Sequence, residues 1–238
     1  MNGQPPGRKN YPFQRSLDWV NFTKPDELLT KVKEDTVFRP LIRADVEQAA
    51  EVISQAFVDD PLCAFMLPFI RTRVMTLRKF FRVYGAVNIR NQRGYGIGEP
   101  LKGVAFWMEP TKPDVSMSIK SLSLFLPLLF TMYPIGYLRA KAILKQIDIL
   151  HQKYAAEPHY YLDNIGVLPA EQGKGYSSGL LRPFLAKADA EKAISYTDTV
   201  TRANVDLYEH FGFHCMEECP VEGTGITVWS LLRPVQLL

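Results

Sequence analysis

The spacing of apolar residues predicts alternating strands and helices from residue 36 to the end of the chain. Residues 1–35 open with glycines and prolines and show no hydrophobic period until about Leu28, so we expect a flexible extension with one short helix. Residues 36–41 have the character of a first strand. The apolar positions after Asp45 then recur at helical spacing, and Asp45 is expected to cap that helix.

The central part of the chain is predicted to contain helices around one pair of strands. The predicted elements are an amphipathic helix at about 73–91, strands at 95–97 and 102–107, and apolar helices at about 114–133 and 135–154. The two apolar helices include residues 121–138, a run without formal charge that is long enough to be considered as a membrane span. Because Pro127 and Pro134 divide this run into pieces of buried-helix length, we predict two buried or pocket-lining helices instead.

The last third of the chain alternates regularly between strands and helices. Strands are predicted at 160–167, 193–200, 213–218 and 225–232, with helices at 174–191 and 205–211. This order favours an α/β layer over a helical bundle. We therefore expect one domain over 36–238, in which flanking helices cover a mixed central sheet.

Composition and charge exclude several classes of protein. With 47% hydrophobic and 22% charged residues, the chain is neither collagen, nor a coiled coil, nor disordered throughout. The net charge of +3 is spread along the chain, so no nucleic-acid partner is expected. Three cysteines form no even-numbered disulfide framework and the N-terminus has no apolar signal core, which predicts a reducing, cytoplasmic location. His210, His214, Cys215 and Cys219 fit no standard zinc spacing, and no metal site is expected.

The segment that follows the strand ending at Val167 has the features of a phosphate-binding loop. Pro169 forces a turn, and a loop with Gly173 and Gly175 opens the next helix. Two glycines at this spacing let consecutive backbone N–H groups converge on one anion, and the helix N-terminus adds positive character.

Three known patterns of phosphate-binding loop can be compared with this segment. The Walker pattern is absent, and the dinucleotide fingerprint lacks its third glycine, because Ser178 stands at that position. The remaining pattern is Q/R-x-x-G-x-G/A. Residues 172–177 (QGKGYS) match it except at the last position, where Ser177 replaces Gly or Ala.

This loop resembles the acetyl-CoA-binding loop of the GNAT superfamily of N-acetyltransferases, and a second signature agrees. Residues 204–213 (NVDLYEHFGF) are similar to the family's later N…Y…GF motif. The order of elements from 36 to 233 also resembles the GNAT acyl-CoA N-acyltransferase fold. The sequence of residues 166–175 (GVLPAEQGKG) looks most like the puromycin acetyltransferase-type branch. The extra helical segment before the CoA-binding strand also resembles that branch.

The resemblance implies that acetyl-CoA is a co-substrate and assigns residues to it. Main-chain groups of Ile165 and Val167, on either side of Gly166, would pair with the pantetheine arm, and the Val167 N–H would face the thioester oxygen. Asn204 would contact the same arm. Ser177 is expected to loosen the fit without abolishing binding, unless the backbone there needs a positive φ. Gln172 belongs to the same cofactor-binding loop. The residues whose backbone would hold the pyrophosphate are Gly173, Lys174, Gly175, Tyr176, Ser177 and Ser178.

Tyr208 and Asp163 are the expected catalytic residues. By the resemblance, Tyr208 would supply a proton to the departing CoA thiolate; the alternative is a core tyrosine on an amphipathic helix. Two-residue alternation places Asp163 on one face of its strand with Tyr161, where it could act as the general base for the amine. The alternatives are that Asp163 anchors a loop or faces water, and that an ordered water takes the proton.

The function that the resemblance implies is acetyl-CoA-dependent N-acetyl transfer to a primary amine of a small, partly apolar molecule. Transfer would be direct, without a covalent enzyme intermediate. One alternative is a non-catalytic acyl-CoA-binding module or sensor on the same fold, and another is a protein tethered to a membrane through 121–138. The expected partner is a small amine, with no membrane partner, and the protein is expected to be a monomer or a homodimer.

Overall fold

The computed structural model describes residues 37–110 and 119–236, with the backbone alone described for 119–135 and 137. All of these residues belong to one unit of contacts, which begins at Asp35. The extension predicted over 1–35 lies outside the described residues. The domain boundary at residue 36 therefore stays a prediction.

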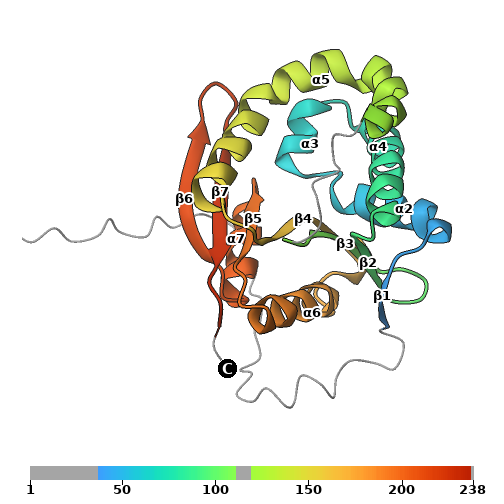
Figure 1. Ribbon diagram of the computed structural model, residues 1–238. Coiled ribbons are helices and arrows are strands. Elements are labelled where there is room, and N and C mark those ends of the chain that lie inside the picture. The colour runs from blue at the N-terminus through green and yellow to red at the C-terminus, as the bar shows by residue number, and fades with distance from the viewer. Residues whose placement is uncertain (1–36, 111–118, 237–238) are drawn as a thin grey trace, which may run out of the picture. The chain divides into compact units, whose positions relative to one another are not determined.

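A seven-stranded sheet forms the centre of this unit (Figure 1). The strand order is β1-β2-β3-β4-β5-β7-β6, and every neighbouring pair is antiparallel except β4 and β5, which are parallel. This is the mixed sheet that the sequence predicts. The strands are β1 (Phe38–Pro40), β2 (Gly94–Ile97), β3 (Gly103–Met108), β4 (Tyr160–Val167), β5 (Ser195–Thr199), β6 (His214–Val221) and β7 (Ile226–Arg233).

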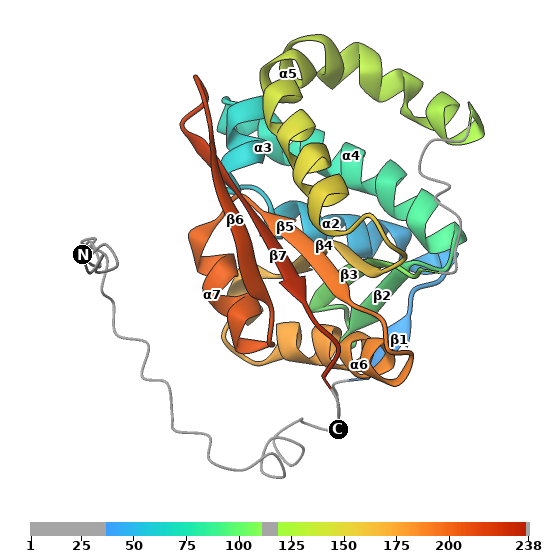
Figure 2. The same ribbon diagram turned by 60° about the vertical axis from the view of Figure 1, so that its left-hand side comes forward.

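Helices cover both faces of the sheet (Figures 1 and 2). On one face lie α6 (Tyr176–Ala190) and α7 (Arg202–His210). On the other face lie the remaining α-helices among the described residues. They are α2 (Val46–Ala56), α3 (Pro61–Met66), α4 (Ile70–Arg90) and α5 (Ile119–Tyr154), and short 3-10 turns occur at η1 (Arg43–Asp45) and η2 (Pro169–Glu171).

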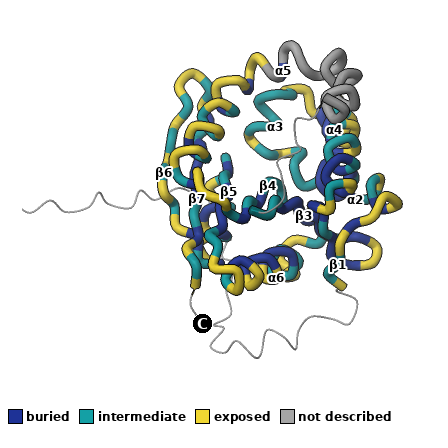
Figure 3. The backbone as a smooth tube through the Cα atoms, in the orientation of Figure 1, coloured by how far each residue is buried: buried dark blue, intermediate teal, exposed yellow. Residues whose placement is uncertain are grey.

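The alternation of side chains along β3 divides the core between the two faces. Ala105 and Trp107 pack with α6 and α7, while Val104 and Phe106 pack with α2 and α4. Figure 3 shows the same division, with buried residues concentrated on β3 and on the inner side of α6. The central strands are therefore held rigidly from above and below, which fixes the positions of side chains on β4 and β5.

The two apolar helices predicted over 114–154 are one helix. α5 runs without interruption from Ile119 to Tyr154 and includes Pro127 and Pro134. A proline inside a helix removes one backbone hydrogen bond and bends the axis, and α5 follows a curved course in Figures 1 and 2. Within residues 37–110 and 119–236, no helix combines the length and the apolar character that crossing a bilayer requires.

A short helix that the sequence pattern did not predict follows α2. The Asp60 carboxylate accepts hydrogen bonds from the backbone N–H groups of Leu62 and Cys63, both at 3.0 Å, and Pro61 occupies the first helical position. The Asp60-Pro61 pair therefore starts α3, since aspartate and proline favour the first positions of a helix.

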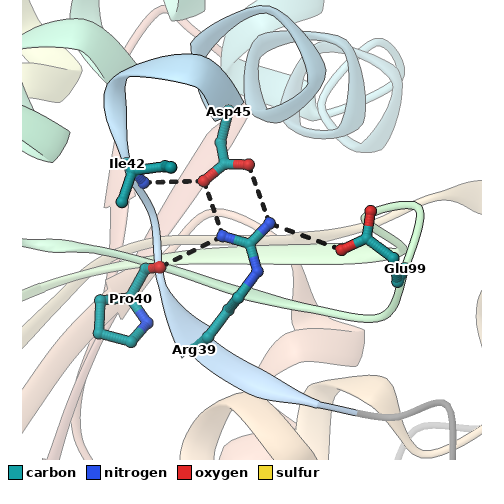
Figure 4. Close-up of polar contacts among 5 residues, drawn as sticks. All are labelled: Arg39, Pro40, Ile42, Asp45 and Glu99. Carbon is teal, nitrogen blue, oxygen red and sulfur yellow. Dashed lines mark hydrogen bonds and ion pairs between the residues drawn. The ribbon is translucent and has the colours of Figure 1, made fainter.

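Asp45 stands at the N-cap position of α2, as predicted, but its side chain forms no capping hydrogen bond with that helix. Its carboxylate accepts two hydrogen bonds from the Arg39 guanidinium, at 2.7 and 2.9 Å, and one from the Ile42 N–H at 2.8 Å (Figure 4). The hydrogen bonds from Arg39 hold the pKa of the Asp45 carboxyl below its ordinary value. Asp45 thus joins β1 to the turn before α2. The charged guanidinium of Arg39 binds the carboxylate more strongly than neutral backbone amides of the helix would.

Candidate active site

Strands β4 and β5 separate shortly after they meet. Tyr160 pairs with Ser195 and Tyr161 with Tyr196, and the register between the two strands ends there. The next contact is between a side chain and the backbone, in which the Thr197 hydroxyl donates to the Leu162 carbonyl at 3.0 Å. Residues 163–167 of β4 therefore present an edge that β5 does not cover, which we call the open edge.

The open edge begins at a β-bulge. On β3, Phe106 pairs with Asn164 while its neighbour Trp107 pairs with Leu162, so Asp163 is an extra residue on β4. A bulge of this kind redirects the side chain of the extra residue. The sequence pattern, which assumed a regular strand, predicted the face of Asp163 but not the bulge.

Backbone N–H groups of the open edge point away from the sheet's paired side. The Leu168 N–H donates to the Lys102 carbonyl next to β3, at 2.9 Å. Because successive peptide groups of a strand point to opposite edges, the N–H groups of Ile165 and Val167 point to the open edge. The Gln172 side-chain amide donates to the Val167 carbonyl at 3.3 Å, which ties the following loop to the end of β4.

The loop between β4 and α6 has the backbone of an anion-binding turn. Gly173 and Gly175 have φ angles of +77° and +86°, in the left-handed region that favours glycine. The Gly179 N–H donates to the Gly175 carbonyl, so the preceding N–H groups of residues 176–178 belong to the first helical turn, where no carbonyl of the helix can accept them. Ser177 lies within α6 and does not have a positive φ, so the condition under which a serine would be a poor fit does not arise.

Lys174 forms an ion pair with its neighbour. Its Nζ atom lies 2.9 Å from Oε2 of Glu171, and Lys102 Nζ lies 3.6 Å from Oε1 of the same residue. The charge of Lys174 is thus partly engaged within the loop. The backbone N–H groups of residues 176–178 are better placed than this side chain to bind an anion.

Tyr208 lies beside the point where β4 and β5 separate. It is on α7 and is 4% exposed, and the Thr197 hydroxyl beside it partly offsets the effect of burial on its pKa. The same Thr197 hydroxyl contacts the Leu162 carbonyl. Burial raises the pKa of Tyr208, which keeps the phenol protonated at neutral pH. One turn earlier, Asn204 donates from its side-chain amide to the Thr199 hydroxyl at 3.1 Å.

Asp163 lies at the same point on the opposite face of the sheet. The Tyr84 hydroxyl on α4 donates to its carboxylate, and Asn164 donates to that hydroxyl at 3.0 Å. Burial and the negative charge of Asp198 raise the pKa of Asp163 to about 7. A carboxylate with this pKa can accept a proton at neutral pH.

Asp198 is a second carboxylate on this face, which the sequence analysis missed. It accepts a hydrogen bond from the Tyr161 hydroxyl at 2.9 Å, and burial raises its pKa to about 6. A signal was present in the sequence, because an acidic residue stands in the middle of a strand whose other residues are uncharged. Tyr84 gave no such signal, since it joins the site only through the packing of α4.

The arrangement can bind one extended ligand and expose it to a base. The loop offers backbone N–H groups for an anion, and the open edge offers strand-like pairing. Tyr208 and Asp163 lie on the two opposite faces of the sheet near the point where β4 and β5 separate. In the part of the chain that the structure describes, no three His, Cys, Asp or Glu side chains are grouped so that they could hold a metal ion.

Comparison with known protein families places these features in one family. A model described as the Acetyltransferase (GNAT) family matches residues 109–213, a range that includes the open edge, the loop and Tyr208. An uncharacterized N-acetyltransferase of Schizosaccharomyces pombe is 28% identical over 180 residues, which are 71% of this chain and 70% of the relative.

Solved structures share the fold at low sequence identity. A Corynebacterium glutamicum protein, described as histone acetyltransferase HPA2 and related acetyltransferase, matches with a TM-score of 0.58 and 21% identity, covering 86% of this chain and 98% of that one. Arylalkylamine N-acetyltransferase 2 of Aedes aegypti matches with a TM-score of 0.56 and 12% identity, covering 85% and 100%. The Drosophila melanogaster polyamine N-acetyltransferase also gives 0.56, with 10% identity and coverage of 84% and 100%.

These comparisons agree with both sequence motifs and with the mixed sheet. The puromycin acetyltransferase-type branch stays a prediction, since the relatives named above have other descriptions. The family model and the S. pombe relative support membership of the GNAT superfamily of acetyltransferases, and the solved structures share its fold.

Proposed function

We propose that this acetyltransferase moves an acetyl group from acetyl-CoA directly to the primary amine of a small, partly apolar molecule. The observation that carries the proposal is the open edge of β4, which joins the loop at one end to Tyr208 and Asp163 at the other. An extended thioester with a diphosphate at its far end matches this layout.

Acetyl-CoA would bind largely through the backbone. The pyrophosphate would accept hydrogen bonds from the N–H groups of residues 176–178 at the start of α6, where the helix dipole favours an anion. The pantetheine arm contains two amide groups, which can pair with the open edge as an added strand does. Val167 supplies one such partner, and Asn204 faces the arm from α7.

The thioester oxygen is better placed against Ile165 than against Val167. Tyr208 lies beside Thr197, whose hydroxyl contacts the Leu162 carbonyl, so the sulfur that Tyr208 would protonate is expected near Leu162. At about 3.3 Å per residue, Val167 is about 7 Å farther along β4 than Ile165. We therefore assign the oxyanion contact to the Ile165 N–H and the arm contact to the Val167 N–H, which differs from the assignment that the resemblance implied.

Asp163 and Tyr208 would transfer the protons of the reaction. The amine nitrogen attacks the thioester carbon, and Asp163 accepts the proton that the nitrogen loses. The resulting oxyanion is stabilised by the Ile165 N–H. When the carbon–sulfur bond breaks, the departing thiolate takes the Tyr208 proton, giving the amide product and free CoA. Neither step needs a covalent bond to the protein.

The surroundings of Asp163 favour an acceptor with a cationic amine and an apolar part. Asp163 and Asp198 supply negative charge on the acceptor side of the sheet, which attracts an ammonium group. An apolar cluster covers the same face where α3 and α5 meet the β6–β7 hairpin. Its members include Leu62, Phe65, Ile143, Ile147, Ile226 and Val228. The names of the arylalkylamine and polyamine acetyltransferases that share the fold are consistent with this acceptor class.

The test is acetyl transfer to a panel of arylalkylamines, aliphatic amines and polyamines, with free CoA and acetylated product both measured. We expect turnover with at least one apolar amine and severe loss of turnover in Asp163→Asn. Tyr208→Phe should also lose turnover. Its matched control is Tyr154→Phe, because the Tyr154 hydroxyl donates to Glu217, at 2.6 Å, away from the proposed site. Tight CoA binding without any acetylated product across the panel would instead favour the acyl-CoA sensor.

A further inference from the structure

A group of large apolar side chains is exposed at the start of α4. Phe69 is 75% exposed, and it is followed on the first two helical turns by Ile70 at 51%, Val74 at 42% and Met75 at 61%. Ile70 and Val74 are one turn apart, so these side chains form one continuous surface. Contiguous apolar surface on this scale marks an interaction site more often than isolated exposed residues do.

This surface is held in place by Arg73, a buried arginine on the inner side of the same helix. Its guanidinium donates to the carbonyls of Val58, Leu67 and Pro68, at 2.8, 2.7 and 3.2 Å. These three bonds engage all three nitrogen atoms of the Arg73 guanidinium, and they hold the turn that presents Phe69 to solvent. The exposure of Phe69 is therefore built into the fold and does not arise from a fraying terminus.

We define the apolar patch as these four residues at the start of α4, Phe69, Ile70, Val74 and Met75.

Basic side chains border the apolar patch on α4. Arg71 and Lys79 are exposed and form no ion pair with another described residue. Arg71, Met75 and Lys79 recur at intervals of four residues, which puts them on one side of α4. Apolar and cationic groups thus share one surface.

We propose that the apolar patch and its basic border dock on the surface of an anionic lipid bilayer. Apolar side chains at the start of a helix, bordered by lysine and arginine, fit the boundary between acyl chains and negatively charged headgroups. No described helix can cross a bilayer, so the contact is peripheral. A symmetric dimer through this surface is disfavoured, since each basic residue would meet basic residues of the other copy. The sequence analysis expected no membrane partner, and the exposed patch changes that expectation.

Sedimentation of the purified full-length protein with vesicles tests this docking. We expect binding to phosphatidylcholine vesicles that contain phosphatidylserine, weak binding to phosphatidylcholine alone, and loss of binding at high salt. The double variant Phe69→Glu, Met75→Glu should bind at least about tenfold more weakly. Met216→Glu is the matched control, because Met216 is 41% exposed on β6 and lies outside the patch. Unchanged acetyl transfer and circular dichroism would show that the double variant folds.

Two further variants separate the charge from the apolar contact. Arg71→Ala with Lys79→Ala should weaken binding to anionic vesicles and reduce its dependence on salt. Equal sedimentation with both vesicle types, or wild-type binding by the Phe69→Glu, Met75→Glu protein, would overturn the proposal. So would a dimer of the wild type in light scattering that the double variant abolishes, since the patch would then serve self-association.

Discussion

The Tyr84 hydroxyl on α4 donates a hydrogen bond to Oδ2 of Asp163, seventy-nine residues later in the chain. The Asn164 side-chain amide donates to the same hydroxyl at 3.0 Å, so the single Tyr84 proton is directed to Asp163. This contact holds the carboxylate of the bulged residue against the helix that packs on β3. It connects the position of the proposed general base to the packing of α4.

Replacing Tyr84 by phenylalanine should impair the base without removing it. Without the donor, the carboxylate anion is less stable and the pKa of Asp163 rises further. We expect kcat/KM at neutral pH to fall about tenfold, and the ascending limb of its pH profile to move to higher pH. Tyr95→Phe is the control, because the Tyr95 hydroxyl donates to the Gln92 carbonyl, at 3.4 Å, and not to Asp163. A uniform loss of rate at every pH would mean that Tyr84 has only a structural role.

Asp198→Asn should move the same limb in the opposite direction. The negative charge of Asp198 contributes to raising the pKa of Asp163 to about 7, so neutralising it lowers that pKa. The pH profile of kcat should therefore begin to rise at lower pH, and KM for a cationic amine should increase. If the ascending limb of the pH profile disappeared in Asp198→Asn and remained in Asp163→Asn, Asp198 would be the general base and Asp163 the residue that tunes it.

Tyr208→Phe should slow the departure of CoA and leave coenzyme binding intact. The substitution keeps the buried ring and removes the proton donor, so we expect kcat to fall about a hundredfold. The loss should shrink with an acetyl donor whose thiol is more acidic, because such a thiolate leaves without protonation. Calorimetry should give the same affinity for CoA as in the wild type. An equal loss with both acetyl donors would contradict the role of Tyr208 as the acid.

Gly175 in the loop allows the effect of backbone conformation to be tested apart from that of steric crowding. An added Cβ at Gly175 would meet nothing within 4 Å, yet the φ of +86° is unfavourable for alanine. Gly175→Ala should therefore distort the start of α6, at a cost of about 1 kcal/mol, and weaken CoA binding about fivefold. Ser177→Gly is the matched control and should bind CoA nearly as well as the wild type. Equal affinity of the Gly175→Ala protein would show that the loop does not hold the diphosphate.

Local patterns in the sequence were sufficient for the strands and for half of the site. The strand-turn-helix pattern around Gly173 and Gly175 depends on residues close together in the chain, as does the spacing from Asn204 to Tyr208. Hydrophobic alternation likewise located β4 at the residues where the structure has it. These features are determined by neighbouring residues, which is why a sequence reveals them.

Features that depend on distant packing could not be predicted in this way. Pro134 is compatible with either the end of a helix or a bend, and only the packing of α5 at Gly136 on Met66 distinguishes the two. The bulge at Asp163 arises from the register with β3, and Tyr84 reaches Asp163 only because α4 packs above that strand. The electrostatic environment of the base therefore became visible only in three dimensions.

Asp163→Asn should stabilise the folded protein above neutral pH. The folded pKa of about 7 exceeds the value of about 4 in an unfolded chain, so between these values the folded state binds more protons. The contribution of Asp163 to stability is fully present below about pH 4 and is lost as the pH rises to about 7. At about pH 8 the asparagine should raise the unfolding free energy by about 4 kcal/mol relative to its effect at about pH 4, because it removes a buried charge. Thermal unfolding at about pH 4 and about pH 8 measures this difference. Asp148→Asn is the control, because Asp148 is an exposed residue of α5. A shift in Tm that is the same at both pH values would contradict a raised pKa and, with it, the assignment of Asp163 as a base poised near neutrality.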